Sequence, residues 1–344
     1  MVPSHRPDQP GIDAPDPSPS LQRVALRSRV RTVTGGRIDP QEHDIDPSVP
    51  GLVADGHAYY QTGDRRGLGP AMRWASSNGA RSLTVLAEAE VAGDLARRAG
   101  HLSADASLRV EVWSASGPEV EPAEPVALAA PPALSEEHRR FASMIAEAGA
   151  RPIDDHGLLV AEVAGLEVAR VIDDPDGHGP RLSVGVGQAD RELQGYLHGR
   201  LDDDTNLRRA IGAVVRDRRP GSAAHPLSRL SRQRWLRSIV IDDPGLLGLD
   251  ALEAVAPLRP PRTLLSQEPV AAAGPSVVVV CSVGVDLDLL PEAADYRHRE
   301  DPDADLIVVT PERDRRLVAG TLIDIVPRLR LVSIEAPWEA RPAG

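Results

Sequence analysis

Strand-length apolar runs alternate with helix-length segments near the start of this 344-residue chain. The sequences GLGPAMRWASSNGA (67–80) and EVAGDLARRAGHL (90–102) predict helices, and the sequences SLTVLAE (82–88) and LRVEVWS (108–114) predict strands. Strands joined by helical segments of this length pair in parallel, with the helices as crossover connections. Upstream of them, RVALRSRVRTVTGG (23–36) alternates in polarity and predicts a first strand,. This region predicts a Rossmann-like α/β unit.

The end of the chain shows the same alternation. Strands are predicted at 277–283, 305–310 and 329–334, with helices at 289–298 and 312–325 between them,. A second Rossmann-like unit follows from this pattern. The sequence leaves open whether the two units share one sheet.

The middle of the chain has a different rhythm. A helix begins at SEEHRR, where Ser135 is a good N-cap,. Three apolar strands follow at 157–164, 166–173 and 181–187, and their short connections predict an antiparallel meander,. A helix beginning near Asp190 and an Arg-rich helical region come next.

The predicted fold class is therefore α/β, with Rossmann-like units at both ends and a central antiparallel meander plus helices. The expected organisation is a disordered tail at 1–20, an N-terminal α/β unit at 21–116, a Pro/Ala/Glu linker at 117–134, a helix–three-strand–helix unit at 135–200, an Arg-rich helical segment at 201–270 and a C-terminal α/β unit at 271–344.

Composition excludes several kinds of chemistry. The sequence has no lysine, so its 39 basic residues are all arginine, and a lysine Schiff base or phosphate-loop lysine is impossible,. The single cysteine, Cys281, excludes an internal disulfide and fits a reducing compartment,. The N-terminus lacks a secretion-signal pattern and no apolar run is long enough to span a bilayer. We expect a cytoplasmic protein without a membrane partner.

Arginine gathers between positions 208 and 237 in a chain whose net charge is −12. The stretch contains Arg208, Arg209, Arg216, Arg218, Arg219, Arg229, Arg232, Arg234 and Arg237, with Trp235 among them and Asp217 as its one acid. A guanidinium group can donate two parallel hydrogen bonds to two oxygens of one phosphate, and an indole ring can stack on a base. The stretch predicts a contact with a polyanion, most simply nucleic acid. The alternatives are solvated helix faces or an interface with an acidic protein.

A second candidate site follows the predicted strand at 277–283. Asp286 and Asp288 lie in the loop that leaves this strand, where ligands bind in open α/β sheets,. Two acids disfavour a phosphate ligand and suggest a divalent cation or a hydroxyl-bearing ligand. The alternative is that Asp288 caps the following helix. There is no dinucleotide signature, because Asp190 stands where the third glycine after Gly185 and Gly187 should be,. No other cofactor is indicated.

The element order of residues 135–200 resembles the core of the PD-(D/E)XK restriction-endonuclease-like superfamily. That resemblance implies a divalent metal held by acids on neighbouring strands, and here only Glu162 and Glu167 are candidates. The chain departs from the motif, since the third strand has no acid and lysine is absent. The resemblance therefore implies a nuclease-like fold more than a nuclease activity.

The phrases EVAGLEVARV and VVVVCSVGVDLDLLPEAADYR resemble stretches of uncharacterised proteins from GC-rich actinobacteria, which supply no activity or site residue. The sequence thus favours a non-catalytic binding or regulatory module that contacts a polyanion through residues 208–237. The alternatives are a divergent metal-dependent nuclease or hydrolase using Glu162 and Glu167, and a structural protein–protein interaction module. Whether the protein is an enzyme stays open at this point.

Overall fold

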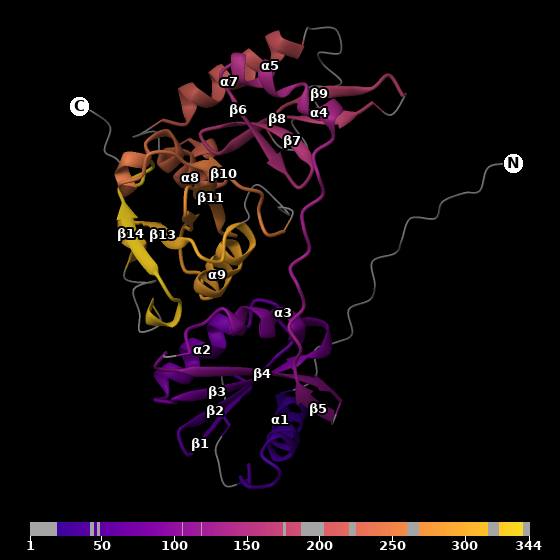
Figure 1. Ribbon diagram of the computed structural model, residues 1–344, viewed down its shortest axis with the longest axis vertical. Helices are drawn as coiled ribbons and strands as arrows, with labels where there is room; N and C mark the ends of the chain where they lie inside the picture. The colour runs from indigo at the N-terminus through magenta and orange to yellow at the C-terminus, as the bar shows by residue number, and fades with distance from the viewer. Residues whose placement is uncertain are drawn as a thin grey trace, which may run out of the picture.

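The chain forms three separate sheets with helices packed on them, as the computed structural model in Figure 1 shows. The structure describes residues 19–41, 45–46, 49–104, 106–117, 119–174, 177–186, 203–219, 225–259, 268–315 and 323–339. The first and last units have a five-stranded sheet each, and the middle unit has a four-stranded one. The predicted α/β fold is confirmed, and the two end units do not share a sheet.

The N-terminal unit has its strands in sequential order. These are β1 (Gly51–Ala54), β2 (His57–Thr62), β3 (Ser82–Glu88), β4 (Arg109–Ser116) and β5 (Glu119–Pro122). The pairs β2–β3 and β3–β4 are parallel, and the crossovers are α2 (Leu68–Ser77) and α3 (Ala89–Gly100). The outer pairs are antiparallel. The strand β5 lies within the predicted linker, so the unit extends beyond Ser116.

The segment predicted as the first strand is instead the helix α1 (Pro19–Val33). Leu26 and Val30 are fully buried in a small core with Leu52, Tyr59 and Leu86 of the sheet. Residues four positions apart lie on the same face of a strand, and they also lie on the same face of a helix, about one turn apart. The spacing of Leu26 and Val30 therefore could not distinguish a strand from a helix.

The C-terminal unit is built from β10 (Glu253–Ala254), β11 (Val270–Gly274), β12 (Val277–Cys281), β13 (Asp305–Pro311) and β14 (Leu329–Ile334). Its helices are α8 (Arg232–Asp242) and α9 (Leu289–Glu300), which belong to separate cores containing alternate residues of β12. The predicted helix at 312–325 contains the short 3-10 turns η3 (Glu312–Asp314) and η4 (Ile323–Ile325). Residues 316–322 between them lie outside the described part.

The middle unit is the expected antiparallel meander. It contains β6 (Arg151–Asp155), β7 (Leu158–Val163), β8 (Leu166–Asp173) and β9 (Pro180–Val184), and β6 was not predicted. Helices α4 (Glu136–Arg139), α5 (Ala142–Glu147) and α7 (Asp203–Asp217) contribute to this unit. The Ser135 hydroxyl accepts the His138 N–H, so the predicted N-cap is confirmed. The predicted helix near Asp190 lies outside the described residues.

The two end units share one structural pattern. In each, an antiparallel hairpin leads into a parallel strand, a loop and a helix. The loop has the form Gly-x4-Leu-x-Pro in both, with Leu68 and Leu289 as the first helical residues and Pro70 and Pro291 two positions later. Proline fits the first turn of a helix because its missing N–H would have no partner there. The sequence therefore contains a short internal repeat that composition alone does not reveal.

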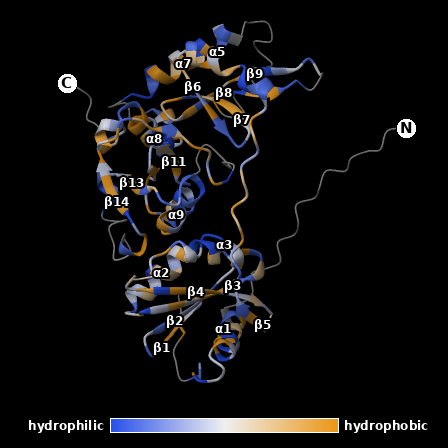
Figure 2. Ribbon diagram, in the orientation of Figure 1, coloured by the Kyte–Doolittle hydropathy of each residue, from blue (hydrophilic) through white to orange (hydrophobic). Residues whose placement is uncertain are grey.

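Buried ion pairs join the two end units through α9. In Figure 2 this helix shows hydrophilic segments, yet Glu292 and Asp295 on it are each 1% exposed. Asp295 accepts two hydrogen bonds from Arg97, at 3.0 and 3.1 Å, and one from Arg98 at 2.8 Å. Glu292 lies 3.5 Å from both Arg66 and Arg98. The interface between the end units is thus charged in its centre.

We expect Asp295→Asn to lower the free energy of unfolding by about 3–5 kcal/mol, because the substitution leaves two buried guanidinium groups without their carboxylate. Urea denaturation measures this free energy of unfolding. The control is Asp303→Asn, whose side chain is 97% exposed and should change stability by less than about 0.5 kcal/mol,. Equal stability of Asp295→Asn and the wild-type protein would show that these pairs do not hold the units together.

Candidate nucleic-acid interface

The helix α7 divides the arginine stretch into an inner and an outer side. Leu207, Ile211 and Val214 are buried against the meander, at helical spacing. Arg209 and Arg216 are exposed on the opposite side of the helix. Arg208 is exposed at its flank, where it donates to the Glu147 carbonyl, and Arg219 is exposed in the turn after the helix. The amphipathic pattern of the sequence fixes this orientation, since the apolar stripe must face the core. Four of the nine predicted arginines are therefore exposed on α7 or directly after it.

Acidic side chains lie close to Arg208 and Arg216, and Arg219 also acts on Asp217. The Arg208 Nε lies 2.9 Å from Asp204, and the Arg216 Nε lies 3.0 Å from Asp217. Each pair is exposed, and the acids raise the pKa of the Arg208 and Arg216 guanidinium groups. Exposed ion pairs are weak, so a phosphate can compete for such arginines.

Arg229 and Arg232 lie beyond α7. Arg229 is exposed at the end of η1 (Pro226–Arg229), a 3-10 turn that packs against α7. Arg232 is half-buried, and its guanidinium lies 5.1 Å from the Trp338 ring centroid. Burial lowers the Arg232 pKa. Of these two, only Arg229 is exposed, on a turn that contacts α7.

Three arginines of the stretch are structural, contrary to the prediction that they contact a polyanion. Arg218 is 3% exposed and donates to the backbone carbonyls of Leu227, Leu230 and Ser231, and burial lowers its pKa to about 9. Arg234 donates to Asp155 at 2.9 Å. The remaining buried arginine of the three, Arg237, forms its ion pair with a carboxylate of the meander.

Trp235 does not offer a stacking surface for a base. Its side chain is 4% exposed and packs at 5.5 Å from Trp338, between ring centroids. The Arg218 guanidinium covers the ring at 4.5 Å from its centroid. The sequence places Trp235 among arginines. On α8, however, the Trp235 side chain faces the core of the C-terminal unit together with Leu236 and Val240.

The two carboxylates proposed as metal ligands do face each other, because Glu162 and Glu167 are paired in the register of β7 and β8. Both are already in ion pairs. Glu162 accepts from Arg237 at 2.8 Å, and Glu167 accepts two bonds from Arg170, at 2.6 and 2.8 Å. Their side chains are nearly inaccessible. A metal ion would have to displace arginine from each carboxylate, so the geometry corrects the expectation of a metal site here. Among the described residues, no three His, Cys, Asp or Glu side chains form a cluster suited to a metal ion.

The loop with Asp286 and Asp288 meets the N-terminal unit. Asp286 accepts from Arg66 at 2.6 Å. Asp288 occupies the N-cap position of α9 but makes no capping bond there, which corrects the cap interpretation. Its Oδ1 accepts the Gly69 N–H at 2.6 Å, in the first turn of α2. A Cβ on Gly69 would lie 1.9 Å from the Leu287 carbonyl oxygen, so only glycine allows this approach.

Burial raises the pKa of both aspartates, and the Asp288 pKa reaches about 7. The second carboxylate oxygen of each is buried with no hydrogen-bond partner in the described part of the chain. The two acids line a cavity of about 270 Å³ with Arg66, Pro70 and Val283. Neutral Asp288 would be stable in this place, because Arg66 compensates only one negative charge directly.

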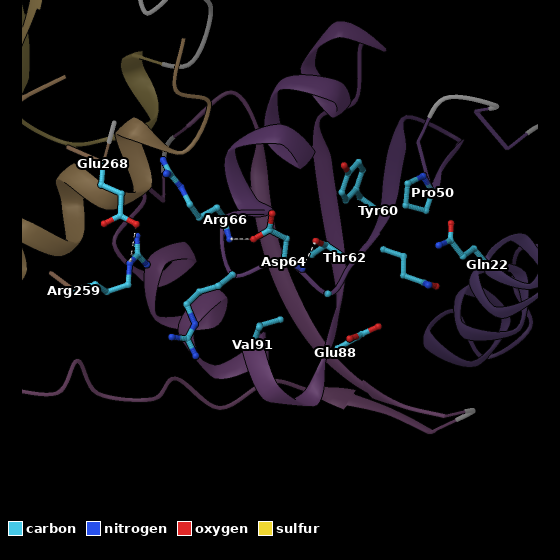
Figure 3. Close-up of a pocket in the computed structure, with 13 residues that line it drawn as sticks. Gln22, Pro50, Tyr60, Thr62, Asp64, Arg66, Glu88, Val91, Arg259 and Glu268 are labelled. Atoms are coloured by element: carbon cyan, nitrogen blue, oxygen red, sulfur yellow. Dashed lines mark hydrogen bonds and ion pairs between the residues drawn. The ribbon is translucent and has the colours of Figure 1, made fainter. Parts of the chain in front are cut away.

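A larger polar cavity lies at the carboxyl ends of β2 and β3, and sequence reasoning missed it. Its volume is about 960 Å³, and Figure 3 shows its side chains spread between Arg259 and Glu268 at one end and Gln22 and Pro50 at the other. Gly63 directly follows β2 and lines this cavity, and a glycine after a parallel strand is a sequence signal for a ligand-binding loop,. The lining mixes arginines with carboxylates, which suits a small polar molecule and selects no single class.

The chain was compared with protein-family models, curated proteins and solved structures, and none of the three comparisons gives a match. No described helix is long and apolar enough to cross a membrane. Function has to be argued from the chain's own geometry.

We expect Asp288→Asn to change how stability depends on pH. Because burial raises the Asp288 pKa from 3.8 to about 7, the folded chain keeps a proton here that the unfolded chain releases,. The free energy of unfolding therefore falls as pH rises from 3.8 towards 7, by up to about 1.4 kcal/mol per pH unit from this group,. Asparagine still accepts the Gly69 N–H and has no proton to lose.

The measurement is urea unfolding of both proteins between pH 5 and pH 8. The variant should gain stability relative to the wild-type protein as pH rises, and the difference should level off above about 7,. Asp250→Asn removes the same charge from an exposed position and serves as the control. A stability difference that is the same at every pH would contradict the raised Asp288 pKa.

Proposed function

We propose that this protein is a non-catalytic binding module that contacts nucleic acid through the outer face of α7 and η1. The observation that carries the proposal is the division of α7 into a buried apolar side and an exposed side with Arg209 and Arg216, with Arg208 exposed at the flank and Arg219 directly after the helix. A regular helix packed on a sheet holds these charges in fixed positions, which reduces the entropy lost when they bind.

The spacing of the arginines suits a phosphate backbone. Along the axis of α7, Arg209 and Arg216 are about 10 Å apart, at 1.5 Å per residue,. Successive phosphates of one duplex strand rise about 3.4 Å along the axis. The axial separation of the two arginines is therefore about three times this rise. Side chains of this length adjust to the remaining difference.

The other carboxylates and arginines favour binding over catalysis. Glu162 and Glu167 are held by arginine, and Arg218, Arg234 and Arg237 stabilise the fold. In the described part of the stretch, the accessible charged side chains are mostly arginines, and Asp217 lies beside them, 3.9 Å from His225. Cys281 is buried, and burial raises its pKa to about 12, so this thiol is not a candidate nucleophile,.

The test uses the full chain and the variant Arg209→Gln/Arg216→Gln/Arg219→Gln. Fluorescence anisotropy with a labelled 30-base-pair duplex and a labelled single-stranded RNA gives Kd at several salt concentrations between 50 and 200 mM. The variant should bind more weakly, and its plot of log Kd against log salt should be shallower by about 2–3, since each phosphate contact contributes about 0.9 for duplex DNA.

The matched control is Arg73→Gln/Arg81→Gln/Arg109→Gln, which removes three exposed arginines from the N-terminal unit and gives the same net charge. It should bind like the wild-type protein. No binding at 50 mM salt, or equal binding by the α7 variant, would overturn the proposal. Salt-sensitive association with itself in place of nucleic-acid binding would select the protein-interface alternative.

A further inference from the structure

The helix α1 lies in a basic sequence of the N-terminal unit that contains no acid. Residues 19–38 contain five arginines and neither aspartate nor glutamate, in a chain with 51 acids. Arg23 and Arg31 are exposed and Arg27 is half-buried. These three residues are spaced by four, so they form one row along the helix, about 12 Å long at 1.5 Å per residue.

This row opposes the local preferences of a helix. Like charges four residues apart repel each other, and arginine in the first turns opposes the helix dipole. Two helices of the chain follow the preference: α3 has Glu90 in its first turn and arginines in its last, and α9 has Glu292 in its first turn and basic residues in its last. The first turn of α1 has no acid, and Arg31 in its last turn is favourable to the dipole. Arg23 and Arg27 therefore gain nothing from the dipole, and neighbouring arginines of the row repel each other.

Among the described residues, the acids that interact with α1 include Glu88, which acts on Arg29, and Asp39, which acts on Arg27 and Arg31. Arg29 is buried and donates to the Gly117 carbonyl, in the turn before β5, where Glu119 and Glu121 are exposed. At 100° per residue, Arg29 points about 160° away from both Arg27 and Arg31. On the side of the arginine row, Arg31 pairs with Asp39 at 3.2 Å, and both are exposed. The row is open to an external anion.

We propose that the exposed face of α1 is a second polyanion-binding surface, which takes the phosphate backbone of a nucleic acid. An anionic membrane is the other polyanion that a basic helix could meet. Lying in a membrane requires a broad apolar face, but Leu26 and Val30 are buried against the sheet, which leaves Leu21 and Val24 as the exposed large apolar residues of α1. A charge-driven contact with phosphates fits this face better than insertion.

The position of α1 gives this surface a distinct role. Figure 1 shows α1 in the unit at one end of the long axis of the molecule and α7 at the other end, with the C-terminal unit between them. One short nucleic-acid segment cannot follow both helices. The protein therefore joins two segments, or two distant parts of one folded strand. The bridging rests on the proposed function of α7, whereas binding by α1 does not.

The first experiment compares the wild-type protein with Arg23→Gln/Arg27→Gln/Arg31→Gln, using the anisotropy assay and the same three-arginine control variant. Glutamine is a good helix former, and thermal melting followed by circular dichroism checks that the variant folds. The α1 variant should show a salt dependence of binding shallower by about 2–3 in log Kd against log salt. A slope and affinity equal to those of the wild-type protein would overturn the proposal.

The second experiment measures bridging, with energy transfer between two duplexes that carry different dyes. The wild-type protein should bring them together, and the α1 variant should bind one duplex without bridging. If the α7 variant alone still binds and bridges, the proposed function of α7 fails while binding by α1 stands. Vesicles containing phosphatidylserine test the membrane alternative. If the wild-type protein binds them, the α1 variant does not, and neither binds nucleic acid, the proposal is overturned and α1 binds a membrane surface.

Discussion

The fold depends on carboxylates that are buried in α9 and surrounded by arginines of the N-terminal unit. Burying a charge is costly unless it is paired and its remaining hydrogen-bonding capacity is filled. Asp295 meets this condition with bonds from Arg97 and Arg98 and a nearby His101. Arginine is well suited to the task, because its five N–H groups reach several acceptors at once. A lysine-free chain uses arginine for what other proteins divide between two residue types.

The same chemistry explains why the arginine stretch is not one surface. Arg234 and Arg237 connect α8 to the meander through Asp155 and Glu162. Gly165 permits this packing, since a Cβ there would lie 2.2 Å from the Trp235 backbone nitrogen. These buried arginines are inaccessible, so they cannot serve an external ligand. The exposed arginines of the stretch lie on and next to α7, and a second exposed row lies on α1, near the other end of the molecule.

The internal repeat gives a physical reason for the arrangement of the end units. Both have a Gly-x4-Leu-x-Pro loop after a parallel strand, but the loop with Arg65 and Arg66 is basic and the loop with Asp286 and Asp288 is acidic. Opposite charges let the two copies meet, with Arg66 on Asp286 and Asp288 at the start of α2. The anion-binding position at the N-terminus of α2 is thereby filled from within the chain.

The sequence by itself determined most strands, the meander and the two α/β units, because the apolar periodicity of these segments is long enough to separate strand from helix. It could not assign α1, where two buried residues fit both periods, and it could not separate the arginines of 208–237 into inner and outer ones. Only the tertiary structure decided that Arg218, Arg234 and Arg237 are buried. It also decided that Glu162 and Glu167 form ion pairs with arginines and that Asp288 accepts a backbone N–H of α2. Each of these contacts joins residues distant in the chain, and a charge has the same appearance in a sequence whether its partner is water, a ligand or another part of the fold.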